Sequence, residues 1–184
     1  GLGVHPASWS DTPLSCMAAP AGLARLSGFR LQTACSAAGE KGSAALAGVF
    51  PLGRGFTAGA GGSWEGNGKT AVLELASCYV LTGDPIGFME GLYGPSVTLG
   101  ASITGDYSTE LEETGFQAGA GIQFSLFPSF ALGVNCDDIA DEPLVNTGFS
   151  HVFNRNLEIH ASYGESTWRG GAELTVSPSL KLYA

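Results

Sequence analysis

Apolar residues alternate with small polar residues or glycine along most of this chain. In one such segment the apolar positions are Val97, Leu99, Ala101 and Ile103. The same period of two recurs in residues 116–126, 157–163 and 168–176. Because successive side chains of a β-strand point to opposite faces, this period predicts strands with one apolar and one polar face.

Ten segments show this pattern, and an eleventh begins at Lys181. They cover residues 29–37, 42–52, 55–64, 69–81, 96–106, 115–127, 130–136, 145–153, 157–164 and 168–176. Residues 114–136 carry no charge, but their alternation and the break at Pro128 favour a hairpin over a helix. We therefore expect consecutive strands that run up and down an antiparallel sheet.

Length and polarity of the segments favour a membrane protein. Many are longer than the typical strand of about 5 to 6 residues, and they match the roughly 9 to 11 residues that cross a bilayer. Aromatic residues gather near segment ends, at Phe50, Phe56, Trp64, Tyr79, Phe127, Phe130, Phe153 and Trp168. The sequence predicts an all-β protein, an antiparallel up-and-down transmembrane β-barrel of about 10–12 strands. A soluble sandwich or a filament subunit is the alternative, since it also alternates apolar and polar positions.

The expected organisation is an irregular N-terminal segment, residues 1–28, followed by a β-barrel, residues 29–184. Residues 20–26 are expected to form one helical turn that plugs or brackets the barrel. An odd number of strands would need a further strand from residues 1–28, from a continuation of the chain or from another chain.

Charge is scarce and unevenly placed. Charged residues make up 14% of the chain, and 17 acids against 8 bases give a net charge of −9, which argues against non-specific nucleic-acid binding. Most acids lie on or beside the connections 38–41, 65–68, 107–114, 137–144 and 165–167, which an up-and-down sheet places at one end. The other end has mostly tight turns, with the longer connection 82–95 as the exception. Because longer loops normally face the exterior, we expect an acidic external rim.

Polar residues on the non-apolar face are the candidate site residues, because in a barrel they would line the lumen. They are Arg30, Gln32, Glu74, Gln117, Gln123, Glu158, His160, Arg169 and Glu173. Their charges either pair across a narrow lumen, since an unpaired charge in a confined site is costly, or form a polar path for an amphipathic solute.

Catalytic and cofactor motifs are not evident in the sequence. The three histidines lie on different segments, and the glycine-rich stretches lie inside strands with no following helix, unlike a phosphate loop. We expect neither an enzyme nor a cofactor. The weak candidates for a metal site are Asp137, Asp138, Asp141 and Glu142, whose carboxylates could bind Ca²⁺ or Mg²⁺ but lack the spacing of a loop motif.

One short motif and several later segments carry a family resemblance. Residues 19–24, Ala-Pro-Ala-Gly-Leu-Ala, resemble the "NPAGLA" segment of the PorV/FadL-like outer-membrane proteins, including the related spirochaetal family, with Ala19 in place of the usual Asn. Residues 130–135, 147–150, 156–160 and 171–174 are similar to the repeated C-terminal hairpins of that family. The chain is much shorter than the 14-stranded members.

The resemblance implies a barrel in the outer membrane of a diderm bacterium, related to long-chain fatty-acid transporters or secretion-system shuttle barrels. Two functions follow as expectations. The first is FadL-like uptake of a hydrophobic or amphipathic solute. The second is a structural or interaction barrel without transport activity, serving as a secretion cofactor, an anchor or an assembly subunit. The expected partners are the lipid bilayer, a hydrophobic solute, and a protein partner or a second copy, but no nucleic acid.

Overall fold

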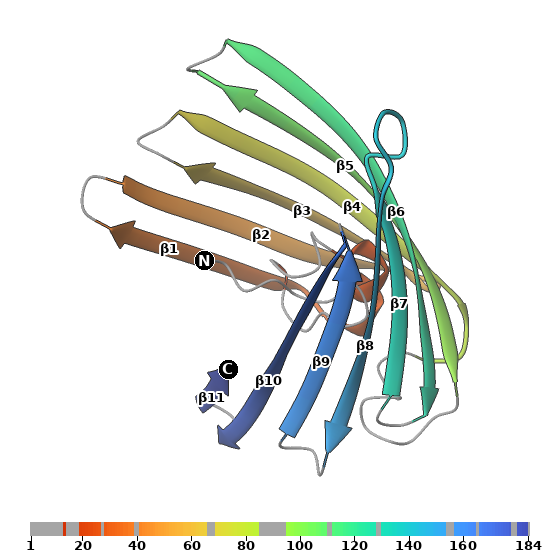
Figure 1. Ribbon diagram of the computed structural model, residues 1–184. Helices are drawn as coiled ribbons and strands as arrows, with labels where there is room; N and C mark the ends of the chain where they lie inside the picture. The colour runs from red at the N-terminus through yellow and green to blue at the C-terminus, as the bar shows by residue number, and fades with distance from the viewer. Residues whose placement is uncertain are drawn as a thin grey trace.

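Eleven antiparallel strands form one strongly curved sheet in the computed structural model (Figure 1). The structure describes residues 13, 19–26, 28–38, 41–65, 69–84, 95–109, 112–127, 130–153, 157–164, 166–177 and 180–183. The strands are β1 (Arg30–Ala38), β2 (Lys41–Gly53), β3 (Phe56–Glu65), β4 (Thr70–Thr82), β5 (Ser96–Ser108), β6 (Glu113–Phe127), β7 (Phe130–Asp137), β8 (Leu144–Phe153), β9 (Leu157–Gly164), β10 (Thr167–Ser177) and β11 (Leu180–Tyr183).

Each strand pairs with its neighbours in the chain, so the order in the sheet is the order in the sequence. This confirms the predicted up-and-down antiparallel fold, including the hairpin of β6 and β7. The sheet is not closed, because β1 and β11 are its two edges. Figure 1 shows the sheet curling so that these edge strands lie on either side of an opening. The expected closed ring is therefore not seen among the described strands.

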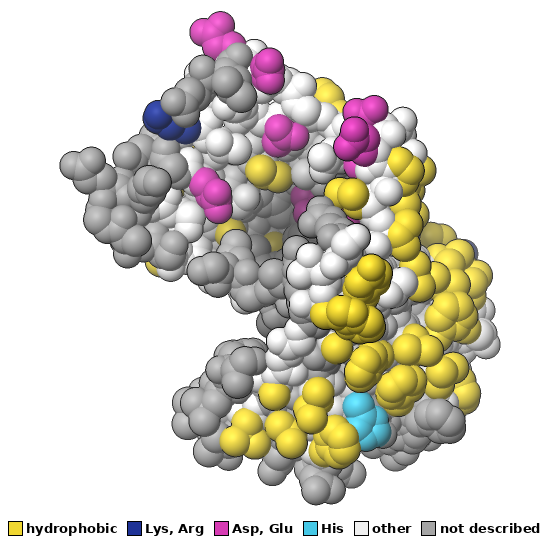
Figure 2. All heavy atoms as spheres, in the orientation of Figure 1, with side chains coloured by type: hydrophobic (Ala, Val, Ile, Leu, Met, Phe, Trp, Pro, Cys, Tyr) yellow, Lys and Arg dark blue, Asp and Glu magenta, His cyan; other side chains and the backbone are white. Residues whose placement is uncertain are grey.

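The two faces of the sheet differ in polarity as the alternation predicts. Large apolar side chains of one parity are exposed on the convex face, for example Leu73, Ile103 and Phe116. The concave face carries small and polar residues, and many of them are buried, for example Thr98 and Gln123. Figure 2 shows the apolar side chains gathered over the outside of the sheet and the acidic ones at one end.

A short 3-10 helix, η1 (Pro20–Arg25), lies against the concave face. Pro20 begins it, which suits the fixed φ of proline, and the Gly22 amide donates a hydrogen bond to the Ala19 carbonyl at 2.8 Å. This confirms the helical turn expected at residues 20–26. Leu23 of η1 is 0% exposed and belongs to a small core with residues of β2 and β4. The members of this core are Leu23, Ala24, Leu26, Val49, Ala76 and Cys78.

No helix in the described part of the chain has both the length and the apolar character needed to cross a membrane.

Candidate functional site

The convex face exposes far more large apolar surface than a water-facing sheet normally does. Isolated exposed apolar residues are ordinary, but contiguous patches beyond a few hundred square ångströms mark contacts with protein or lipid. Here the exposed residues follow every second position of neighbouring strands, so the patch is continuous. Its members include Leu31, Leu46, Leu73, Leu75, Leu99, Ile103, Phe116, Leu132, Val134, Phe149 and Ile159.

Aromatic side chains border this apolar face near both ends of the strands. At the end with the tight turns, Phe56 of β3 and Tyr79 of β4 have ring centroids 4.4 Å apart. At the same end, the rings of His151 and Phe153 on β8 meet edge to face at 4.2 Å. At the other end, Tyr163 and Trp168 pack with centroids 5.0 Å apart.

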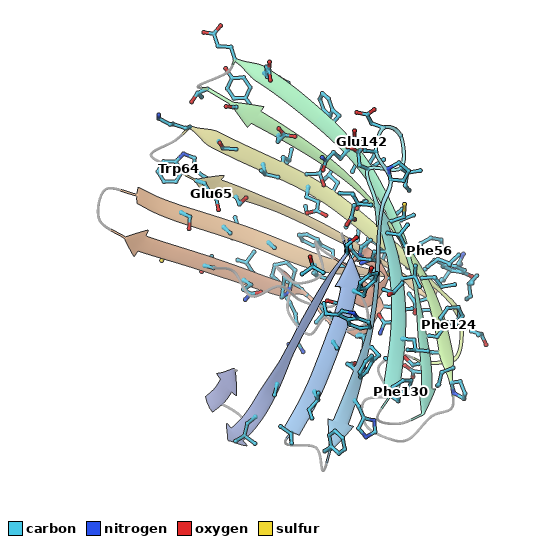
Figure 3. The ribbon with its side chains drawn as sticks, in the orientation of Figure 1. Phe56, Trp64, Glu65, Phe124, Phe130 and Glu142 are labelled. Atoms are coloured by element: carbon cyan, nitrogen blue, oxygen red, sulfur yellow. The ribbon has the colours of Figure 1, made fainter. Side chains whose placement is uncertain are left out.

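Figure 3 shows Phe56, Phe124 and Phe130 on the convex side, toward one end of the strands. Trp64, Glu65 and Glu142 lie toward the other end.

The distance between the two aromatic borders is close to the height of the apolar band on a membrane barrel. Phe56 and Trp64 are eight residues apart on β3, which corresponds to about 26 Å along the strand. A tilt of about 40° would reduce this to about 20 Å, near the apolar band of about 25 Å found on membrane barrels.

The concave face has two chemically different halves. Around Leu23 of η1, the buried inner side chains of β2 and β4 are apolar, and Val49, Ala76 and Cys78 belong to the same cluster as Leu23. The helix η1 also contacts β5 and β6. Along β5 to β8 the buried inner positions are instead mostly hydroxyl and amide residues, with one alanine and one glycine. The buried ones there are Ser96, Thr98, Ser102, Gln123, Ser125, Ala131, Gly133, Asn135 and Ser150.

Neighbouring polar side chains cover several glycines of this half. A Cβ placed on Gly119 would lie 2.8 Å from the Ser102 hydroxyl, and one on Gly121 would overlap the Asn135 amide. Gly115, and Gly164 on the neighbouring strand β9, are covered in the same way by Asp106 and Asn146. At these four positions the volume left by the missing side chain is thus occupied by side chains of adjacent strands.

Two glycines on the inner face accommodate η1. A Cβ on Gly100 would collide with the backbone of Pro20 and Ala21, and one on Gly59 would lie 3.0 Å from the Leu23 side chain. The absence of side chains at these positions lets η1 rest directly on β3 and β5.

The predicted lumen-facing residues whose side chains are described all lie at strand positions that face the concave side, but they differ in exposure. Gln123 is buried at 3% exposed, Gln32 and Glu74 are half-buried, and Arg30 and Gln117 are exposed. The side chains of Glu158, His160, Arg169 and Glu173 lie outside what the structure describes, although their backbone positions pair within β9 and β10. The grouping of the nine candidates into one site therefore stays a prediction.

The described surroundings of Glu74 include a second acid. Among the described residues, the carboxylate of Asp137 acts on Glu74 electrostatically. Asp137 in turn accepts a hydrogen bond from the Asn146 amide at 3.1 Å. This end of the inner face is therefore acidic.

The acidic loop does not form a metal site in the structure. Within the described ranges, no three or more His, Cys, Asp or Glu side chains are grouped so that they could hold a metal ion. This includes the weak candidates Asp137, Asp138, Asp141 and Glu142.

Sequence reasoning did not single out Ser96 and Ser150, which are fully buried on the inner face and have hydroxyls without a hydrogen-bond partner. The alternation already places them on the polar face. Nothing in their residue type distinguishes a buried, unpartnered serine from an exposed one, so the signal for them lies only in the structure.

Comparison with protein-family models, with curated proteins and with solved structures finds no match to this chain.

Proposed function

We propose that this protein is an integral outer-membrane β-sheet protein that gives a hydrophobic or amphipathic solute a path along its concave face. The observation that carries the proposal is the reversed polarity of the sheet. Large apolar side chains lie outside and small polar ones inside, which suits lipid around the sheet and a polar interior.

Matched isoleucine substitutions test whether lipid surrounds the convex face. Ile103, 60% exposed, lies in the middle of β5, and Ile139, 47% exposed, lies in the loop between β7 and β8. An arginine that faces the bilayer centre costs about 2–4 kcal/mol, whereas an exposed surface substitution in water usually stays within about 0.5 kcal/mol. We expect Ile103→Arg to lower the unfolding free energy of the protein in lipid vesicles by about 2–4 kcal/mol.

Ile139→Arg is the control and should change that free energy little. The measurement is reversible urea unfolding in phospholipid vesicles, followed by tryptophan fluorescence. Equal, small effects of both substitutions would show that water faces the convex side and would exclude the membrane assignment.

A structural or interaction role is the second candidate, and the position of η1 favours it. Because η1 rests on Gly59 and Gly100 and packs Leu23 into the concave face, it occupies part of the space that a solute would use. Planar-bilayer recording separates the two roles. Stepwise conductance supports a solute path, whereas absence of conductance together with a stoichiometric co-purifying protein supports an interaction barrel.

A further inference from the structure

Three polar side chains on the inner wall are buried yet have polar atoms with no hydrogen-bond partner. They are Ser96 on β5, Gln123 on β6 and Ser150 on β8, which are 2%, 3% and 0% exposed. Both polar atoms of the Gln123 amide and both serine hydroxyl oxygens lack a partner. A buried amide or hydroxyl normally has one, because leaving it unpaired costs about 1–3 kcal/mol. A bound ligand that supplies these hydrogen bonds would account for them.

The strand register places the three side chains on one patch of wall. Ser96 pairs with Ser125, which pairs with Ala131, and Ala131 pairs with Ser150. Gln123 lies two residues from Ser125 and therefore on the same face. Four adjacent strands span about 14 Å, which suits a head group of one or two sugar rings.

This patch is uncharged, and its neighbourhood sets the kind of ligand it fits. Two rows of paired residues cross β5 to β8 here, one through Ser125 and one through Gln123. Together they hold four hydroxyl residues, one amide, one alanine and two glycines: Ser96, Thr98, Gln123, Ser125, Ala131, Gly133, Gly148 and Ser150. Toward the acidic end, the same face carries Glu74 and Asp137. These eight positions offer a carboxylate no cation. Arg25 belongs to η1, which packs on β4, β5 and β6, and it already has an interaction within the protein. A carboxylate would also be repelled from the acidic end, while a neutral group would satisfy the free donors and acceptors.

We propose that the inner wall of β5 to β8 binds the uncharged hydrogen-bonding head of an amphipathic solute through the Gln123 amide and the Ser96 and Ser150 hydroxyls. This inference rests on the proposed function and specifies its solute as neutral rather than acidic.

Two probes that differ in one charge test the inference. Hexyl β-D-glucoside is neutral, and hexyl β-D-glucuronide has the same tail and ring but carries a carboxylate. Binding is measured by isothermal titration calorimetry on the full chain in lipid nanodiscs, with empty nanodiscs subtracted. We expect the glucoside to bind at least tenfold more tightly than the glucuronide. Equal affinities, or no binding of the glucoside, would overturn the inference.

Gln123→Leu and Gln117→Leu form a matched pair of variants. Both glutamines lie on the inner face of β6, but Gln117 is exposed. Gln123→Leu should weaken glucoside binding about tenfold, as expected for the loss of hydrogen bonds to the ligand. Gln117→Leu should leave it unchanged, and equal losses in both variants would count against the site.

The thermal stability of ligand-free Gln123→Leu separates ligand binding from a structural role. The wild-type amide has no hydrogen bond to lose, so the melting temperature should stay the same or rise. A fall of several degrees would show that the amide holds the protein together, and would overturn the inference. Flotation of the same samples with liposomes tests the membrane assignment separately. Protein that floats but does not distinguish the probes contradicts only this inference, and protein that does not float contradicts the proposed function.

Discussion

Gly100 shows how a single residue determines whether a segment can reach the inner wall. Its Cα faces the backbone of Pro20 and Ala21 so closely that one added methyl group would overlap both. Backbone atoms cannot rotate away as a flexible side chain can, so either η1 or β5 must move. We expect Gly100→Ala to lower the unfolding free energy by about 1–3 kcal/mol, the usual cost of overpacking.

Gly105→Ala is the matched control for this substitution on β5. A Cβ there would lie 3.4 Å from the Phe116 ring on the convex face, which is an ordinary contact distance. Circular dichroism during thermal unfolding in detergent measures both variants. If Gly105→Ala lowered stability as much as Gly100→Ala, the loss would come from adding a methyl group to β5 and not from the contact of Gly100 with η1.

At the scale of elements, η1 is held by the burial of one large side chain. Leu23 is 0% exposed among Val49, Ala76 and Cys78, whereas Leu52, at the end of β2, is 69% exposed. Leu23→Ala leaves a cavity and should cost about 2–4 kcal/mol of unfolding free energy. Leu52→Ala removes the same atoms and should cost under about 1 kcal/mol because its site is open. Urea unfolding in detergent micelles compares the two, and similar losses would contradict the packing of η1.

The strands were predictable from the sequence because their signal is local. The segments expected at residues 96–106 and 115–127 correspond to Ser96–Ser108 and Glu113–Phe127, within two residues at each end. Alternation also assigned Gln117 and Gln123 to the same face. It could not show that one is exposed and the other buried, because burial depends on what covers each position from elsewhere in the chain. For the same reason, the contact of Gly100 with η1 and the proximity of Glu74 to Asp137 were not predictable.

At the scale of the whole molecule, the two ends of the sheet differ in charge and in most of their loop lengths. The exception is the connection of 13 residues between β4 and β5, at the tight-turn end. The loop between β7 and β8 spans residues 138–143 and contains Asp138, Asp141 and Glu142, while β2 and β3 are joined by two residues, Arg54 and Gly55. Three consecutive residues of that tight turn, 53–55, have positive φ, which restricts its shape. Membrane barrels have short periplasmic turns and longer external loops. This difference predicts that the acidic end faces outward.

Single cysteines at the two ends test this orientation. In a variant whose four native cysteines are replaced by serine, Asp141→Cys reports on the acidic end and Arg54→Cys on the tight-turn end. The protein is produced in the outer membrane of a diderm host, and intact cells are treated with a maleimide too large to cross that membrane. We expect Asp141→Cys to be labelled on intact cells and Arg54→Cys only after the membrane is opened, because the short turn would lie in the periplasm. The reverse pattern would place the acidic end inside, and the carboxylates of Glu74 and Asp137 would then lie toward the periplasmic mouth rather than the external one.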